Sequence, residues 1–314
     1  MRVLVTGGAG FIGSNLVTAL TMGGNEVGII DDLSSGKAEN LIGLAWFREM
    51  DILDPALDAA VAEFAPEAVV HLAAQPSVAA SLADPDRDWA VNVEGTRAVA
   101  RAAVAAGATR VVSASSAAVY GEPAELPLKE TSPKAPANPY GRSKLAAEAA
   151  LAEALAPSGT DFASLRFSNV YGPRQDAQGE GGVVSIFASK MIAGQVPVIY
   201  GDGTQTRDFI FVGDVVAAIV TALFVDVELG AAAMPDGPAY NVSTGKETPV
   251  NELAGMMASS ALFARPFSHE PARGGDVARS ALDPAKAAAV FDWQARAGLE
   301  AALKMTLTWF RSQA

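Results

Sequence analysis

The residues best suited to chemistry are a tyrosine and a lysine in the segment Tyr140-Gly141-Arg142-Ser143-Lys144. On a helix, two residues four positions apart lie on the same face. A free tyrosine has a pKa of about 10, so a phenol that takes protons at neutral pH needs a stabilised phenolate. Lowering that pKa by about three units requires about 4 kcal/mol of differential interaction, and the Lys144 ammonium is one source. The pair predicts a proton-transfer site, although the same spacing also occurs by chance on helix surfaces.

Two serines supply hydroxyl groups ahead of this helix. We expect a buried strand over Arg110–Ser115, at whose end stand Ser115 and Ser116. In an open parallel sheet, the carboxyl ends of the strands face the ligand crevice. Ser116 at that edge would hydrogen-bond the substrate hydroxyl that Tyr140 deprotonates. The candidate catalytic residues are therefore Ser116, Tyr140 and Lys144.

A second group of residues, at the start of the chain, is suited to binding phosphates. Gly7, Gly10 and Gly13 follow the apolar run Val3-Leu4-Val5 and open a helix-like pattern. Glycines in this arrangement allow a tight turn, close approach of a pyrophosphate to the backbone, and close packing of helix on strand. The helix N-terminus then points unpaired N–H groups at the phosphates.

An acidic residue about 20 positions further on should accept hydrogen bonds from ribose hydroxyls. Asp31 lies 18 residues after Gly13, at the end of the second apolar run Val27-Gly28-Ile29-Ile30. A glycine triplet alone is also compatible with an ordinary turn. Strand, helix, second strand and acidic terminus together predict dinucleotide binding.

The elements that must position these residues alternate along the chain. We expect strands over Ala45–Met50, Ala68–Leu72 and Phe162–Phe167. Helices should open at Asp54-Pro55 and extend over Asp84–Gly107 and Tyr140–Ala156. Such alternation is typical of an α/β fold with a Rossmann-type doubly wound parallel sheet.

Beyond this alternation, we expect two parts. Residues 1–168 should form the dinucleotide-binding domain, and the strand and helix of 205–225 should also pack on it. Residues 169–204 and 226–314 should form a smaller C-terminal α/β substrate lobe. Within 205–225 the pattern predicts a strand over Arg207–Val212 and a helix from Asp214 to about Phe224.

Composition excludes several function classes. The chain has 314 residues, half of them hydrophobic, and a formal net charge of −12, which argues against nucleic acid or an anionic membrane as a partner. It has no cysteine, and only His71 and His269 could supply imidazole, so we expect no metal site. Met1 leads directly into the first strand and no apolar stretch reaches the ~20 residues of a membrane span, so we expect a cytoplasmic protein.

Taken together, these motifs resemble one enzyme family. The glycine triplet, Asp31, Asn92, Ser116 and the Tyr140–Lys144 pair are similar to those of the extended short-chain dehydrogenase/reductase superfamily. More narrowly, the chain resembles the NAD-dependent epimerase/dehydratase family and, within it, the UDP-glucose 4-epimerases. The likeness runs along essentially all 314 residues, through the segments His71–Gln75, Asn92–Thr96, Arg166–Pro173, Gly201–Phe209 and Arg273–Asp276.

The resemblance implies NAD as cofactor and a UDP-sugar as substrate. The expected NAD-binding residues are Gly7, Gly10, Phe11, Ile12, Gly13, Asp31, Asp32, Ser35, Gly36, Asp51, Ile52, Leu72, Ala73, Ala74, Asn92, Ser115, Tyr140, Lys144 and Phe167. The expected substrate-binding residues are Ser77, Ser116, Tyr140, Asn169, Val183, Tyr200, Gln205, Arg207, Arg273, Asp276 and Ser280.

Some of these roles are specific. The resemblance places Asn169, Arg207 and Arg273 on the diphosphate and Asp276 on the uridine ribose. A dianionic diphosphate in a protein of net charge −12 needs a local cationic clamp, which agrees with the two arginines. The resemblance also puts Ser280 beside the C2 substituent of the sugar, where a small residue leaves room for an N-acetyl group.

One departure from related enzymes narrows the chemistry. Sugar-nucleotide dehydratases and decarboxylases of the superfamily carry acidic residues directly after the catalytic hydroxyl, where this chain has Ala117 and Ala118. Two alanines cannot move further protons, so the residues are equipped for oxidation and reduction at one carbon. We therefore expect C4 epimerisation of UDP-glucose, UDP-galactose or their N-acetylated forms through a transient 4-keto sugar.

Two alternatives remain open. A UDP-glucuronate 4-epimerase would need groups such as Lys190 or Arg174 to meet the C6 carboxylate. A non-enzymatic dinucleotide sensor would have no use for Ser116, Tyr140 and Lys144 together.

We also expect a homodimer. In the resembling family the helices corresponding to 84–107 and 140–156 pair across a two-fold axis. The alanine-rich stretches Ala98-Val99-Ala100 and Ala146-Ala147 are expected to face outward there.

Overall fold

A seven-stranded parallel sheet forms the centre of the molecule, which is described here from a computed structural model covering residues 1–41, 46–177, 182–230, 237–272 and 277–314. The strand order is β11-β6-β5-β4-β1-β2-β3, with every neighbouring pair parallel. The strands are β1 Arg2–Thr6, β2 Glu26–Asp31, β3 Trp46–Glu49, β4 Ala68–His71, β5 Arg110–Ser116, β6 Asp161–Phe167 and β11 Ala239–Val242. This arrangement confirms the expected doubly wound parallel sheet.

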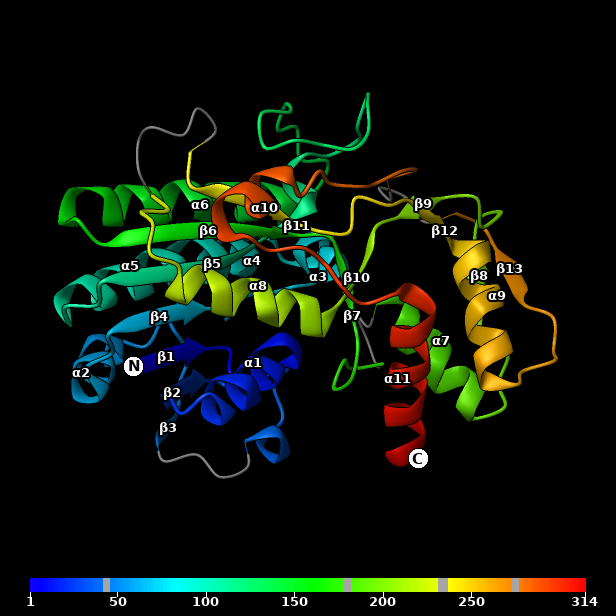
Figure 1. The fold of residues 1–314 in the computed structure, drawn as a ribbon, viewed down its shortest axis with the longest axis horizontal. Helices are drawn as coiled ribbons and strands as arrows, with labels where there is room; N and C mark the ends of the chain where they lie inside the picture. Colours follow the sequence, from blue (N-terminus) through cyan, green and yellow to red (C-terminus); the bar gives the residue numbers. More distant parts are fainter. Residues whose placement is uncertain (42–45, 178–181, 231–236, 273–276) are drawn as a thin grey trace.

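Helices cover both faces of this sheet (Figure 1). One face packs on α1, α8 and α10, and the other on α2, α5 and α6. Burial on both faces explains why the central strands read as continuous apolar runs rather than alternating ones. The helices are α1 Phe11–Met22, α2 Leu57–Phe64, α3 Val78–Ala83, α4 Pro85–Trp89, α5 Gly95–Ala105, α6 Pro139–Leu155, α7 Val183–Ile192, α8 Val212–Phe224, α9 Val250–Ala261, α10 Ala285–Phe291 and α11 Leu299–Ser312.

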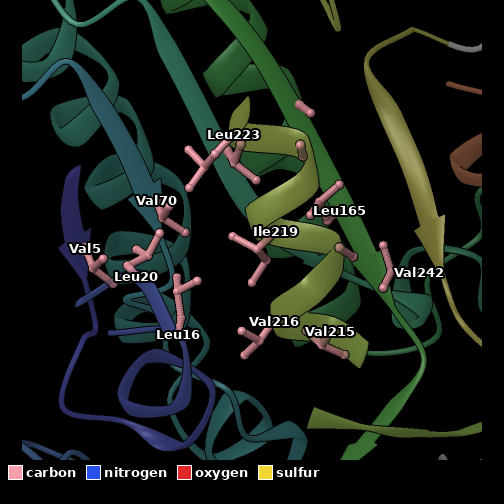
Figure 2. Close-up of a cluster of buried hydrophobic side chains, with 14 of the residues drawn as sticks. Val5, Leu16, Leu20, Val70, Leu165, Val215, Val216, Ile219, Leu223 and Val242 are labelled. Carbon is pink, nitrogen blue, oxygen red and sulfur yellow. The ribbon is translucent and has the colours of Figure 1, made fainter. Parts of the chain in front are cut away.

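Helix α8 packs on the sheet although it follows β10, outside the first 168 residues. Figure 2 shows Val215, Val216, Ile219 and Leu223 of this helix pointing toward the strands and helix α1. Ile219 is fully buried there. Burying side chains of this size contributes about 1.5–3 kcal/mol each, so the helix is held to the sheet by its apolar face.

A second, smaller cluster lies beyond the carboxyl ends of the strands. Helices α7, α9 and α11 pack on one another there, at the right of Figure 1, around a separate core that includes Phe187 and Leu303. Short strand pairs border it: β7 Asn169–Tyr171 with β10 Phe209–Phe211, β9 Thr206–Arg207 with β12 Thr248–Pro249, and β8 Val198–Tyr200 with β13 Ser268–Glu270.

The range 226–314, expected to form the substrate lobe, contributes two elements to the sheet domain instead. Strand β11 pairs with β6, and helix α10 packs against it. All of β11 is buried, and the ring of Tyr240 lies 4.5 Å from that of Phe291 in α10. The outer edge of β6 presents backbone N–H and C=O groups, and this segment supplies the strand that pairs with them.

Three expected elements differ in their bounds. The helix expected over 84–107 divides into α4, a π-helical turn over Ala90–Glu94, and α5. The buried Asn92 lies in this wider turn. The strand expected over Arg207–Val212 divides into β9 and β10 at Asp208, whose fully buried carboxylate accepts hydrogen bonds from the backbone of Thr244 and Gly245.

The helix expected to open at Asp54 also begins later. Asp54 accepts a hydrogen bond from the Ala56 N–H at 2.8 Å and so forms a local turn, and α2 starts at Leu57.

Candidate active site

The glycine-rich turn forms a bare backbone cradle between β1 and α1. Gly7 has a φ of +72°, which side chains rarely adopt. A Cβ on Gly13 would lie 2.1 Å from the Gly7 carbonyl oxygen, so that position excludes any larger residue. No side chain caps the N-terminus of α1, and its first turn contains no acidic residue. The N–H groups of that turn are therefore available to an anion.

A pocket of about 620 Å³ extends from this cradle along the carboxyl ends of β1, β2 and β4. Most residues expected to bind the dinucleotide line it, and so does Ser77. The expected cofactor residues in its wall are Gly7, Gly10, Phe11, Ile12, Gly13, Asp31, Asp32, Ser35, Asp51, Ile52, Leu72, Ala73 and Ala74.

Asp31 closes one side of the pocket with a fixed carboxylate. Its Oδ2 accepts the Ala9 N–H at 2.8 Å and its Oδ1 accepts the Leu33 N–H at 2.9 Å. Burial raises the pKa of Asp31, and these two backbone hydrogen bonds lower it. Gly36 packs directly against this carboxylate, since a Cβ on Gly36 would lie 2.9 Å from Asp31 Oδ1. Each carboxylate oxygen keeps acceptor capacity toward the pocket.

A second acidic residue lies further along the pocket. Asp51 accepts a hydrogen bond from Arg87 Nη2 at 2.9 Å, and both residues line the wall. Burial raises the pKa of Asp51, but the Leu53 N–H and the Arg87 guanidinium together hold it below its usual range.

These features fit a dinucleotide. A cradle without side chains suits a pyrophosphate, and the apolar wall formed by Ile52 and Leu72 suits an adenine ring. The buried Asp31 carboxylate suits ribose hydroxyls.

Helix α6 presents the tyrosine and lysine. Asn138 accepts the Gly141 N–H at 2.9 Å and Pro139 occupies the first helical position, so the helix start is fixed just before Tyr140. A Cβ on Gly141 would lie 2.5 Å from the Ala118 carbonyl oxygen. This close approach brings Tyr140 to the segment that follows Ser116.

Ser116 hydrogen-bonds the Tyr140 side chain, but the electrostatics around Tyr140 differ from the expectation. Burial raises the pKa of Tyr140, hydrogen bonding from Ser116 lowers it, and the charge of Asp88 raises it. The sequence suggested that the Lys144 ammonium would lower the pKa of Tyr140, but Lys144 is not among the groups that shift this pKa. The surrounding chain therefore raises the pKa of Tyr140 rather than lowering it.

Lys144 is buried, with 7% of its surface exposed. Burial lowers its pKa to about 8, while the charges of Glu148 and Asp88 raise it. An ammonium with this pKa is still mostly protonated at neutral pH, so Lys144 keeps a positive charge on the face of α6 that carries Tyr140.

Other expected cofactor residues lie behind the pocket wall. Asn92 is 1% exposed, and its side chain donates to Ser143 Oγ at 3.0 Å and accepts from the Gln75 N–H at 2.8 Å. The Ser115 hydroxyl donates to the Glu148 carboxylate, and Phe167 packs in the sheet core.

The expected substrate residues of the second lobe gather outside this pocket. The Ser280 N–H donates to the Thr206 carbonyl at 3.2 Å, which places it beside Arg207. Gln205 donates to the Tyr200 carbonyl at 2.8 Å. Asn169 is exposed at the start of β7, and Val183 opens α7. Arg273 and Asp276 lie outside the described residues.

Sequence reasoning missed several lining residues. Arg87 gave no signal because its contact with Asp51 spans 36 positions. Gln75 entered only as the last residue of the segment His71–Gln75, although it lines the pocket and its N–H donates to Asn92. Arg174 was considered only for a sugar carboxylate, and the lining residues without any assigned role include Ser34, Lys37, Asn40, Met50, Pro76, Val91, Gln175, Asp176 and Gly182.

The described ranges contain neither a cluster of metal ligands nor a helix long and apolar enough to cross a membrane. These residues contain no group of three or more His, Cys, Asp or Glu side chains able to hold a metal ion. Within the same ranges, every helix is too short or too polar to cross a membrane.

Known proteins resemble this chain along its length. A model of the NAD-dependent epimerase/dehydratase family matches residues 3–242. A UDP-glucose 4-epimerase of Mycolicibacterium smegmatis is 43% identical, over 100% of this chain and 99% of the relative.

Solved structures of UDP-glucose 4-epimerases are also similar to this chain over its whole length. A UDP-glucose 4-epimerase of Thermotoga maritima with UDP-glucose has a TM-score of 0.92 and 38% identity, covering 100% of this chain and 99% of that one. The Thermus thermophilus UDP-glucose 4-epimerase complex with NAD has a TM-score of 0.89 and 39% identity, covering 100% of both chains. The similarity extends over both the pocket and helix α6.

Proposed function

This chain belongs to the NAD-dependent epimerase/dehydratase family, and from that premise we propose that it epimerises a UDP-hexose at C4. The observation that carries the proposal is the position of Tyr140. It lies beside Ser116 and, on helix α6, one turn before the buried Lys144, next to a pocket that fits a dinucleotide. The similarity to UDP-glucose 4-epimerases supports UDP-glucose and UDP-galactose as the substrate pair.

The proton transfers fall to the chain's own residues. Tyr140 accepts the proton of the C4 hydroxyl, and Ser116 hydrogen-bonds the same oxygen and orients it. Lys144 lies one turn further along α6 and is protonated below its pKa of about 8. NAD, when bound, supplies the acceptor and donor of hydride at C4, and its positive ring favours the phenolate. The cradle of Gly7–Gly13 and the Asp31 carboxylate would hold it.

Inversion requires the 4-keto sugar to turn before the hydride returns. Arg207 and Asn169 of the second lobe anchor the diphosphate in this proposal, so the sugar can rotate about that linkage. Tyr140 then returns its proton to the C4 oxygen on the new face. Ala117 and Ala118, next to Ser116, offer no group that could move a further proton, which favours epimerisation over elimination.

The glucuronate alternative finds little support in Arg174. Its Nη1 donates to the Ser14 carbonyl at 2.7 Å and to Thr18 Oγ1 at 3.0 Å. These bonds hold Nη1 against helix α1, and Arg174 lines the dinucleotide pocket. A dinucleotide sensor would not need the proximity of Ser116 to Tyr140.

The test is turnover of a substrate panel. The NAD-loaded protein is incubated separately with UDP-glucose, UDP-galactose, UDP-N-acetylglucosamine and UDP-glucuronate, and each product is separated from its C4 epimer. We expect interconversion of UDP-glucose and UDP-galactose. Turnover of UDP-glucuronate alone would replace the proposal with the alternative, and no turnover of any UDP-sugar would overturn it.

A further inference from the structure

Asp88 is a buried carboxylate to which the mechanism assigns no role. It lies on α4 and is 1% exposed. Its Oδ1 accepts hydrogen bonds from Gln75 Nε2 at 2.9 Å and from Asn92 Nδ2 at 3.1 Å. Its Oδ2 is equally buried and has no hydrogen-bond partner within the described part of the chain. Since a buried carboxylate oxygen without a partner costs free energy, its presence needs an explanation.

The hydrogen bonds of Asp88 lead to helix α6. Asn92 Nδ2, which donates to Asp88, also donates to Ser143 Oγ at 3.0 Å. Ser143 Oγ in turn donates to the Tyr140 carbonyl at 3.0 Å. The carboxylate is thus linked by two side chains to the turn of helix that carries both Tyr140 and Lys144.

The charged groups around Asp88 come from three elements. On α6, burial raises the pKa of Tyr140 and the Asp88 charge raises it further. Burial lowers the pKa of Lys144, which the charges of Glu148 and Asp88 oppose.

The two other titratable residues, His71 and Arg87, do not supply a positive charge that would balance Asp88. On β4, burial lowers the pKa of His71 to about 3, so this imidazole is neutral. On α4 itself, Arg87 pairs with Asp51 instead.

We propose that Asp88 is a positioning residue that acts through Tyr140 and Lys144. Its Oδ1 holds Asn92 and Gln75 against the site, and its carboxylate charge is the counter-charge of the Lys144 ammonium. This inference rests on the proposed function, because it takes Tyr140 as the proton acceptor.

Removal of the charge alone has a directional consequence. The active form requires a Tyr140 phenolate and a protonated Lys144. Without a negative charge at position 88, the phenolate is repelled less and the ammonium is stabilised less, so both pKa values fall. The acidic and basic limbs of the activity profile should therefore move together to lower pH.

The variant Asp88→Asn tests this consequence. It removes the charge, while the amide oxygen can still accept the hydrogen bonds from Gln75 and Asn92. We expect both limbs of the kcat profile of the NAD-loaded enzyme to move down by about one unit. Asp86→Asn is the matched control, since it removes one charge from the exposed side of the same helix. Reduced kcat with both limbs at their wild-type pH, or an increase in KM alone, would show a purely structural role and overturn the proposal.

A second readout does not depend on the sugar. The phenolate absorbance of Tyr140 is obtained as the difference between NAD-loaded protein and its Tyr140→Phe variant, titrated with and without Asp88→Asn. A lower pH of phenolate formation supports the inference even if no UDP-sugar is turned over, and an unmoved titration overturns it even if epimerisation is found. Should Asp88→Asn not fold, Asp88→Ser removes the same charge and must move the titration in the same direction.

Discussion

The backbone N–H of Ala9 donates to Asp31 Oδ2 at 2.8 Å, so the glycine-rich turn and the end of the second strand are joined directly. The Leu33 N–H holds the other carboxylate oxygen at 2.9 Å. The carboxylate cannot swing away from the pocket without losing both bonds. This fixed charge is the basis of the first prediction.

We expect strong preference for NAD over NADP. A 2′-phosphate beside Asp31 would meet a buried negative charge, which costs binding energy. Calorimetric titration of the cofactor-free protein should give at least a tenfold weaker affinity for NADP, and Asp31→Ala should narrow the difference. Tighter binding of NADP, or NADP in the purified protein, would contradict the role given to Asp31.

Replacement of Tyr140 by Phe should abolish turnover. Only the hydroxyl is lost, so folding and NAD binding should change little, while activity should fall to below a few per cent of wild type. Tyr240→Phe is a matched control, because it removes a buried hydroxyl that donates to the Leu229 carbonyl far from the site. Substantial activity in Tyr140→Phe would assign the proton transfer to another group.

Activity should fall on the alkaline side as Lys144 loses its proton. Burial lowers the pKa of this ammonium to about 8, so the protonated form predominates below that pH and declines above it. The kcat of the NAD-loaded enzyme should show a descending limb with an apparent pKa of about 8. Lys144→Met, which has no proton to lose, should have low activity at every pH and no such limb. A flat profile through pH 9 in the wild type would refute this assignment.

The range of UDP-sugars that the protein accepts should depend on Ser280. This residue is 9% exposed, and its N–H donates a hydrogen bond to the Thr206 carbonyl. If it lies beside the C2 substituent, the wild type should accept UDP-N-acetylglucosamine as well as UDP-glucose. Ser280→Tyr should then suppress the acetylated substrate and spare the plain one, because the added ring excludes only the added group. Equal loss of kcat/KM on both would show that Ser280 does not line that part of the site.

A homodimer is expected, but not through all the residues first suggested. Val99, Ala100 and Ala147 are buried within the protomer, and Val99 and Ala100 belong to the core that α2, α5 and α6 form with the sheet. Ala98 and Ala146 are half-buried and remain candidates for the contact.

Light scattering at micromolar concentration should give twice the mass of the 32.2 kDa chain. Ala146→Arg should shift the population toward the monomer, because a long charged side chain prevents close approach of helices. A wild-type monomer under these conditions would contradict the prediction.

Local sequence was enough for the cradle and for helix α6. The turn between Gly7 and Gly13 is built from seven consecutive residues, and a Cβ on Gly13 would collide with the Gly7 carbonyl oxygen of the same turn. The spacing of Tyr140 and Lys144 likewise needs only a helix, which Asn138 and Pro139 start. Interactions between near neighbours in the chain are visible in the sequence because backbone geometry alone fixes them.

Tertiary structure decided the contacts between distant segments. Arg87 meets Asp51 across 36 positions of the chain, and Asp88 is buried on α4, which packs on α6. In the same way, Asp208 interrupts a predicted strand because it binds the backbone of Thr244 and Gly245. A side chain's charge and burial are set by whatever packs against it, and for these residues that partner lies tens of positions away.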